Sequence, residues 1–195
     1  MFENFTRYLL DKIDLTEGEL SLIILQCVSK KLRKKQYLLE AGEVWRYDVF
    51  VSSGLLKLYF LDDKGLEHIL QFVPENHWTG DRESMLTGLP SKLHIDAIEG
   101  SEVVMIQNQD FEMLRRTIPS FNDFVNDTLN KNVLAHQQRI HNSITGSAEE
   151  KYNNFILRFP QIINRIPLHM IASYLGVSAE TLSRIRSQTA KKQDL

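Results

Sequence analysis

The sequence predicts an α+β fold, in which an N-terminal antiparallel β-roll of jelly-roll type with flanking helices is followed by a long helix and a C-terminal helix-turn-helix. Three observations support this. Short β-rich runs separated by glycines fill residues 34–107, and such regular turn signals are typical of small antiparallel barrels or sandwiches. One apolar stripe at helical spacing runs through residues 121–141, and two short helical stretches then meet at Gly176. We therefore expect three units, at residues 1–118, 119–143 and 144–195.

Residues 2–28 show a helical pattern. Thr16–Glu19 has the sequence of a capping box, and apolar residues then recur at helical spacing up to Cys27. From about Lys34 the period changes to that of short strands. The β-rich runs are residues 49–51, 55–60, 68–73, 93–98 and 103–106. Helix is predicted again from Asn108 to Arg116.

The long helix carries an apolar stripe that we interpret as a dimer seam. The stripe is formed by Phe121, Val125, Leu129, Val133 and Ile140. A long helix with a single seam outside a compact roll favours packing against a partner helix, so we expect a homodimer. The alternative is that the helix packs on its own roll. Residues 143–146 are expected to form a hinge, and a capping box at residues 147–150 begins a helix that continues through Phe159.

Composition excludes several classes of protein. No apolar run approaches the ~18–20 residues that a membrane span needs, and Met1–Phe5 lacks the basic start of a secretory signal. The single cysteine, Cys27, excludes an internal disulfide, a cysteine-based zinc site and a four-cysteine iron–sulfur cluster. We expect a cytoplasmic protein with no membrane partner.

The net charge of −2 conceals an asymmetry. Residues 151–195 hold seven Lys or Arg and two acids, a balance of +5, which leaves −7 for the other 150 residues. A basic end on an acidic body fits a module that contacts phosphate only at that end, although a solvated surface would have the same composition.

Residues 168–185 have the pattern of two short helices joined by a tight turn. Apolar residues fall where two crossed helices pack against a third, at Ile171, Leu175, Val177, Leu182 and Ile185. Gly176 lies in the turn, where a residue tolerant of positive φ is needed. The second helix then presents Ser178, Ala179, Glu180, Thr181, Ser183, Arg184 and Arg186 on its outer side. In a DNA-binding helix-turn-helix this part enters the major groove; the alternative is a helical hairpin with an ordinary core.

This order of elements resembles the Crp/Fnr family of bacterial transcription regulators over nearly the whole chain. The most specific pieces are Ala41–Glu43 and Val49–Gly54 in the roll and Ile171–Arg184 at the end. The resemblance implies a dimer, not an enzyme, that binds a two-fold site in double-stranded DNA and recruits or obstructs RNA polymerase. It also implies control by a small-molecule effector, which the sequence does not identify.

The resemblance further implies that a recognition helix over residues 178–188 reads bases through Glu180, Ser183 and Arg184. The chemistry is suitable, because Arg184 can donate to O6 and N7 of guanine and Glu180 can accept from N4 of cytosine. Ala179 stands where the Fnr branch has an apolar residue, so half-sites related to TTGA are expected. Ser178 and Thr181 are expected to cap the helix and contact phosphate. The alternative for Glu180 and Arg184 is an exposed ion pair within the helix.

One departure from the family concerns the wing, a β-hairpin that often follows the recognition helix. This sequence runs only about ten residues past Ile185. The phosphate contacts of a wing are therefore expected to be absent or to be supplied by Arg186, Lys191 or Lys192.

The effector pocket is expected beside the sixth strand of the roll. Counting without gaps against cyclic-nucleotide-binding members places Gly80 and Asp81 opposite their ribose-binding pair, and Ser91 and Lys92 opposite their phosphate-binding pair. Trp78 and Arg82 complete the expected pocket. The phosphate-binding arginine is missing, and lysine lacks the planar fork that suits a phosphate, so cyclic AMP is not the expected ligand. No haem, metal or iron–sulfur cofactor is expected either, because the histidines are scattered and the cysteines of the Fnr oxygen sensor are absent.

Two other functions compete with DNA binding. A metal-dependent enzyme on a cupin-like roll would need clustered histidines and a carboxylate, which the sequence lacks. A ligand-binding signalling module that acts through protein partners would be favoured if Glu180→Ala and Arg184→Ala left transcription unchanged. No Ser-His-Asp arrangement, phosphate loop or pair of catalytic carboxylates predicts an enzyme.

Overall fold

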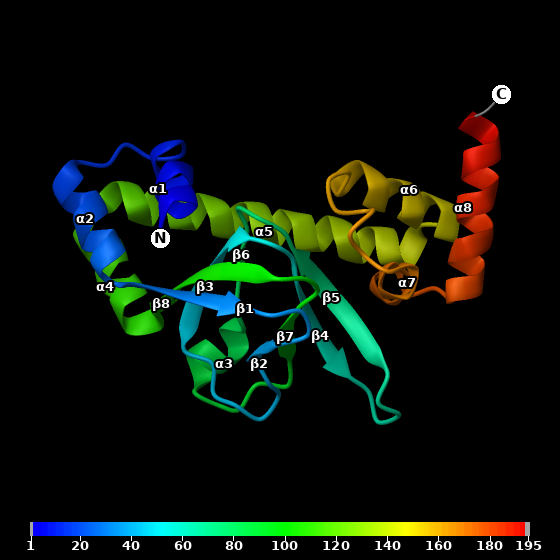
Figure 1. Ribbon diagram of the computed structural model, residues 1–195, viewed down its shortest axis with the longest axis horizontal. Coiled ribbons are helices and arrows are strands. Elements are labelled where there is room, and N and C mark those ends of the chain that lie inside the picture. Colours follow the sequence, from blue (N-terminus) through cyan, green and yellow to red (C-terminus); the bar gives the residue numbers. More distant parts are fainter. Residues whose placement is uncertain (1, 194–195) are drawn as a thin grey trace.

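The computed structural model describes residues 2–193, with side chains up to Gln188, so the side chains of Lys191 and Lys192 lie outside it. Two short helices, α1 (Glu3–Leu10) and α2 (Glu17–Leu25), lie at one end of the molecule (Figure 1). The long helix α5 (Pro119–Thr145) crosses the β-roll. The opposite end is formed by α6 (Ala148–Arg158), α7 (Leu168–Leu175) and α8 (Ala179–Gln193).

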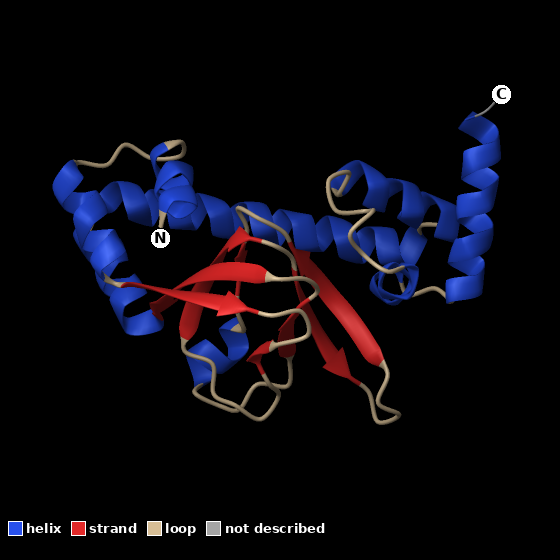
Figure 2. Cartoon of the chain, viewed as in Figure 1, coloured by secondary structure: helices blue, strands red, loops and turns tan. Residues whose placement is uncertain are grey.

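The predicted antiparallel roll is confirmed and consists of two four-stranded sheets (Figure 2). Their strand orders are β1-β8-β3-β6 and β2-β7-β4-β5. The strands are β1 (Cys27–Leu32), β2 (Tyr37–Leu39), β3 (Tyr47–Ser53), β4 (Leu56–Leu61), β5 (Glu67–Val73), β6 (Trp78–Thr79), β7 (His94–Ala97) and β8 (Ser101–Gln107). A short helix, α3 (Arg82–Thr87), lies between β6 and β7, and α4 (Asn108–Thr117) follows β8. The five β-rich runs of the sequence are all strands.

The N-terminal helical region ends earlier than predicted. The capping box is present, since Thr16 Oγ1 accepts from the Glu19 amide at 3.3 Å and the Glu19 carboxylate accepts from the Thr16 amide at 2.8 Å. However, α2 ends at Leu25, and Cys27 and Val28 already pair with β8. The prediction of helix through residue 28 was wrong because apolar residues continue without a break from the helix into the strand.

Three apolar cores hold the molecule together. One fills the roll, around Val49, Leu56 and Ile95, and a second packs the N-terminal helices and α4 against the outside of β3 and β8. The third joins the outer face of β4 and β5 to the C-terminal helices and includes Tyr59, Phe72, Phe155, Ile171 and Leu182. The helix-turn-helix is therefore packed directly on the roll. At its turn, Gly176 has φ +67° and caps α7, as its position in the sequence indicated.

The apolar stripe of α5 is divided between two environments, which corrects the predicted dimer seam. Phe121 and Val125 are buried in the second core of the same chain, and Leu129 packs against that core. Val133 and Ile140 are 55% and 59% exposed. The first half of the stripe thus packs on its own domain, because α4 and α1 cover it, and only the second half is open. No helix in the described part of the chain is long and apolar enough to cross a membrane.

Candidate DNA interface and effector groove

The first turns of α8 present a polar surface to solvent. Leu182 and Ile185 point into the core that joins α8 to α6 and α7, and this fixes the opposite side of the helix outward. Ser178, Ala179, Glu180, Ser183, Arg184 and Arg186 are exposed, and Thr181 is half-buried. The structure thus leaves the residues that the sequence predicts for base and phosphate contacts accessible to solvent on the first turns of α8, Thr181 only in part.

Local hydrogen bonds prepare this surface. Ser178 Oγ accepts from the Thr181 amide at 3.2 Å, which confirms Ser178 as the cap of α8. Backbone hydrogen bonding, with a contribution from Ser178, lowers the pKa of Glu180, so its carboxylate is charged near neutral pH. Among the described side chains no ion pair joins Glu180 to Arg184, so the carboxylate and the guanidinium can each engage a separate partner.

A second set of contacts docks α7 on the edge strand β5. Ser173 Oγ accepts from the Ile69 amide at 3.1 Å and donates to the Glu67 carbonyl at 2.6 Å. Arg139 of α5 donates to the carbonyls of Ile69 and Leu70, and its guanidinium lies 4.4 Å from the centroid of the Tyr174 ring. The exposed backbone groups of β5 are thereby used to hold the helix-turn-helix.

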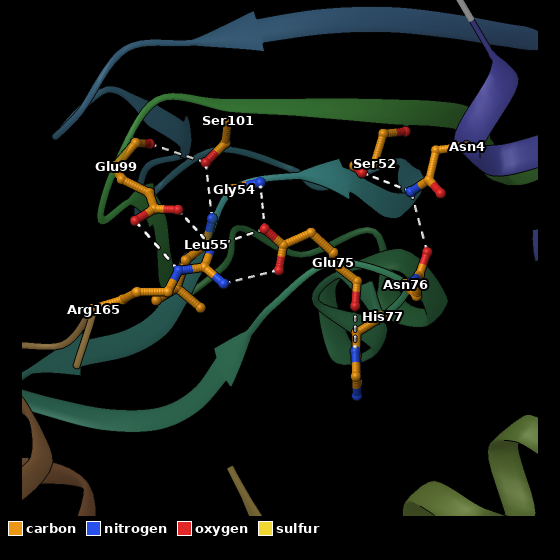
Figure 3. Close-up of polar contacts among 10 residues, drawn as sticks. All are labelled: Asn4, Ser52, Gly54, Leu55, Glu75, Asn76, His77, Glu99, Ser101 and Arg165. Atoms are coloured by element: carbon orange, nitrogen blue, oxygen red, sulfur yellow. Dashed lines mark hydrogen bonds and ion pairs between the residues drawn. The ribbon is translucent and has the colours of Figure 1, made fainter. Parts of the chain in front are cut away.

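Arg165, in the loop between α6 and α7, clamps this end to the roll (Figure 3). It binds Glu75 through two parallel bonds of 2.8 and 3.0 Å and also binds Glu99. Glu75 in addition accepts from the Gly54 amide at 2.9 Å. Burial would raise the pKa of Glu75, but the bonds from Arg165 hold it below its usual value, so the carboxylate stays charged. Sequence analysis missed this cluster, because nothing in the spacing of the three residues indicates that they meet.

A groove of about 1080 Å³ lies between the roll and the C-terminal helices. It contains Gly80, Asp81 and Arg82 of the predicted effector pocket, but not Trp78, Ser91 or Lys92. Sequence analysis missed the groove's other cations, Arg139, Lys151 and Arg158. Helical spacing alone places His136, Arg139 and Ser143 on one face of α5, and this could have identified that wall.

Comparisons with known proteins agree with this arrangement. Residues 29–117 match the family model described as "Cyclic nucleotide-binding domain". The fumarate and nitrate reduction regulatory protein of Vibrio cholerae is 27% identical over 179 residues, which cover 85% of this chain and 70% of that protein. FixK2 from Bradyrhizobium japonicum has the same fold, with a TM-score of 0.75 at 18% identity and 86% of each chain covered. A transcriptional regulator of the crp/fnr family from Eubacterium rectale has a TM-score of 0.70 at 17% identity, with 95% of this chain and 88% of that chain covered.

The chain is similar to regulators of the Crp/Fnr family in sequence and in fold. Within this structure, two residues of the predicted effector pocket bind each other. Asp81 caps α3 by accepting from the amides of Glu83 and Ser84, and Ser91 Oγ donates to its carboxylate at 2.6 Å. Both residues are about 95% buried. The expectation that Asp81 and Ser91 present free groups to a ligand is therefore corrected.

Trp78 requires a second correction. Its ring packs edge-on against Phe5, Phe50 and Phe111, at centroid distances of 5.5 to 5.8 Å, in the core outside β3. Alternation along a strand explains this placement, because Thr79 takes the opposite face of β6 from Trp78. Lys92 is exposed and lies outside the groove.

The described residues contain no group of three or more His, Cys, Asp or Glu side chains placed to hold a metal ion. The thiol of Cys27 is half-buried and donates to the Ile23 carbonyl at 3.2 Å. Burial raises its pKa to about 12, so the thiol stays protonated near neutral pH.

Asp48 on β3 should make the stability of this protein depend on pH. Burial raises its pKa from 3.8 to about 6, and one carboxylate oxygen has no hydrogen-bond partner in the described structure. The folded chain therefore binds a proton here more tightly than the unfolded chain does. The free energy of unfolding should fall as the pH rises from about 4 to about 6, by about 2 kcal/mol for this group, and stay level above. We expect Asp48→Asn to remove this component.

The measurement is urea denaturation of both proteins between pH 4.5 and 7.5. Other carboxylates titrate in the same range, so the informative quantity is the difference in unfolding free energy between wild type and Asp48→Asn at each pH. A difference that does not change with pH would contradict the prediction.

Proposed function

We propose that this transcription regulator binds a two-fold site in double-stranded DNA as a homodimer, with residues 178–188 of each protomer in the major groove. The observation that carries the proposal is the surface of α8, where Glu180, Ser183 and Arg184 stand exposed on a helix that Leu182 and Ile185 anchor. Arg184 is assigned to guanine, Glu180 to cytosine and Ala179 to a thymine methyl, in half-sites related to TTGA. Thr181 and Arg186 are assigned to phosphate.

The exposed half of the α5 stripe supports the dimer. Val133 and Ile140 are joined there by Leu134 and Ile144, which are 65% and 78% exposed, and by Leu157 of α6, which is 80% exposed. Large apolar side chains that stay exposed on the second half of α5 and on α6 are typical of an interaction surface. Phe121 and Val125 are excluded from the seam because they are buried in their own chain.

The remaining assignments follow from this proposal. RNA polymerase is the further partner, the protein acts in the cytoplasm, and it is a regulator rather than an enzyme. An effector controls it, and cyclic AMP is not that effector, because Asp81 and Ser91 are occupied by one another. We expect no haem or iron–sulfur cluster. The alternative, a signalling module acting through protein partners, is tested by the same experiment.

The experiment is selection of retained sequences from a random duplex library by the purified full chain. We expect an enriched palindrome with TTGA-like arms. Arg184→Ala should then weaken binding to that sequence by ten- to a hundredfold, since a bidentate guanine contact contributes about 1–3 kcal/mol of discrimination. Arg186→Ala should weaken specific and non-specific binding alike and reduce the salt dependence by about one counterion.

Arg116→Ala, an exposed residue of α4 far along the chain from α8, is the matched control and should bind as wild type does. An enriched palindrome unrelated to TTGA would support the proposal of a dimeric DNA-binding regulator but would overturn the assignment of bases to Arg184, Glu180 and Ala179. Absence of enrichment, with and without extracts of small metabolites, would favour the signalling module.

A further inference from the structure

Strand β1 forms a free edge of the β-roll. In its sheet β1 pairs only with β8, over the positions from Cys27 to Leu32. The described structure gives the backbone of residues 28–32 no hydrogen-bond partner other than β8. Since the N–H and C=O groups of an edge strand point alternately toward the sheet and away from it, part of this backbone is open to a further strand.

The other edge strands of the two sheets are less available. β5 is covered by α7 through Ser173 and by Arg139 of α5. β2 and β6 have only three and two residues. Among the described strands, β1 is therefore the longest edge without a cover.

The free edge is basic. Five of the six residues from 30 to 35 are lysine or arginine, whereas residues 1–150 as a whole carry a net charge of −7. Lys30 is half-buried, and the exposed ones are Lys31, Arg33, Lys34 and Lys35. In the part of the chain that the structure describes, no salt bridge neutralises any of the five. Positive charge concentrated along one edge favours a partner that brings negative charge to it.

The turn after β1 has a fixed backbone. Lys35 has φ +67° although it is not glycine, and its amide donates to the Ala97 carbonyl at 2.7 Å. The Gln36 amide donates to the Arg33 carbonyl at 2.9 Å, and the Gln36 side-chain oxygen accepts from the Arg33 amide at 2.9 Å. A left-handed residue other than glycine persists only where its surroundings determine it. The basic turn is thus already in position beside the end of β1, which lowers the entropic cost of binding.

The two sides of β1 indicate what an added strand would carry. Pairing with β8 places Val28 and Lys30 on one side of the sheet and Ser29 and Lys31 on the other. Val28 is 61% exposed. Glu102, opposite Lys31 on β8, accepts instead from Ser29 Oγ at 3.0 Å. Opposite charges across a strand pair are favourable, so the added strand should carry acidic residues, with an apolar residue beside Val28.

Two other occupants fit these observations less well. A second copy pairing through its own β1 would place lysines against lysines, and like charges across a strand pair are unfavourable. A nucleic acid could meet the cations but would leave the N–H and C=O groups of the edge without a strand to pair with. Figure 1 shows β1 beginning beside α2, at the opposite end of the molecule from α8, so this edge is separate from the proposed DNA surface.

We propose that β1 is a docking edge for an extended acidic peptide of a partner protein, which adds as a further strand beside residues 28–32 and continues along the basic turn. Backbone hydrogen bonds supply the pairing, and the cations of residues 30–35 select for negative charge. The interaction is additional to DNA binding and does not depend on it.

The test uses a fluorescein-labelled peptide of four Glu-Val repeats and the full chain without DNA. The comparison peptide has the same sequence and charge but is N-methylated at every residue, so it cannot donate to a strand edge. We expect the first peptide to bind about tenfold or more tightly than the second. It should also slow amide hydrogen exchange in residues 27–32, because their outward N–H groups become bonded.

The variant that tests the charges combines Lys31→Gln, Arg33→Gln and Lys34→Gln, all at exposed positions. It should weaken the peptide about tenfold, since three surface charge pairs are lost. Lys64→Gln, an exposed lysine in the β4–β5 hairpin, is the matched control and should bind as wild type does. The unfolding midpoint, measured for both variants, should not change.

Four results would overturn the proposal. Equal binding of the two peptides would mean attraction of charge without strand addition. Equal binding by the triple variant and Lys64→Gln would remove the basic run from the interaction. A random DNA duplex that slows exchange in β1 as the peptide does would assign the edge to nucleic acid. Protection of β1 that increases with protein concentration alone would assign it to a second copy. The peptide titrations contain no DNA, so their failure is separate from failure of the DNA selection.

Discussion

Replacing Phe155 with alanine should destabilise the β-roll as well as the C-terminal helices, by about 3–5 kcal/mol. Phe155 is 3% exposed and stands where the two halves of the chain share a core. Its ring lies 6.0 Å from that of Phe72 on β5, 5.3 Å from that of Phe159 and 5.5 Å from that of Tyr174. Truncation leaves a cavity that neither half can close alone, because each is held by its own strands or helices.

The measurement is urea denaturation followed by tryptophan fluorescence. Both tryptophans, Trp45 and Trp78, belong to the roll, so their signal reports on the half of the molecule that does not carry the substitution. We expect their transition to move to lower urea in Phe155→Ala. Asn154→Ala, one residue earlier on the same helix but exposed, is the control and should change stability by less than about 1 kcal/mol. A tryptophan transition that stays in place while helical signal is lost would show that the two halves unfold separately.

Substitution of Gly54 by alanine should be comparably severe, for a different reason. Gly54 connects β3 to β4 with φ +91°, and a Cβ there would lie 2.3 Å from Ser101 Oγ and 2.6 Å from the Gly100 carbonyl oxygen. Backbone atoms cannot move aside as a flexible side chain can, so the turn itself must shift. That shift would also disturb the bond from the Gly54 amide to Glu75. We expect a loss of about 3 kcal/mol or more in the free energy of unfolding.

Gly65 provides a comparison that separates the effect of the left-handed backbone conformation from the effect of the close contact. Its φ is +75°, also left-handed, but an added Cβ would meet nothing within 4 Å. Gly65→Ala should therefore cost only the conformational strain, about 1–2 kcal/mol. Chemical denaturation of the two variants under identical conditions tests the argument, and equal losses would refute the role assigned to the close contact with residues 100 and 101.

Features set by a few neighbouring residues could be predicted from the sequence. The capping boxes at Thr16 and Ser147 and the left-handed glycine at Gly176 depend on hydrogen bonds within one turn, and all three are present. The exposed side of α8 was predictable for a related reason, because the spacing of Leu182 and Ile185 fixes which face is buried.

The remaining features depend on which surfaces meet in space. Phe121 and Val133 have the same pattern along α5, yet one is buried by α4 and the other is open, and no periodicity distinguishes them. Trp78 could be placed beside Gly80 but not on a particular side of a strand only two residues long. Arg158 becomes a neighbour of His136 only because the C-terminal helices fold back on the roll, whereas Arg139 is one turn away from His136 on the same helix.

The clamp formed by Arg165 bears on whether this helix-turn-helix is interchangeable with others. If this helix-turn-helix were transferred to another sensor domain, it would carry the half-buried Arg165, which would need two carboxylates from the new domain. A foreign helix-turn-helix grafted onto this roll would leave Glu75 and Glu99 facing each other with no cation between them. A chimaeric regulator joined near residue 146 should therefore fold stably only if it contains all three residues of the cluster, Glu75, Glu99 and Arg165, or equivalents at these positions.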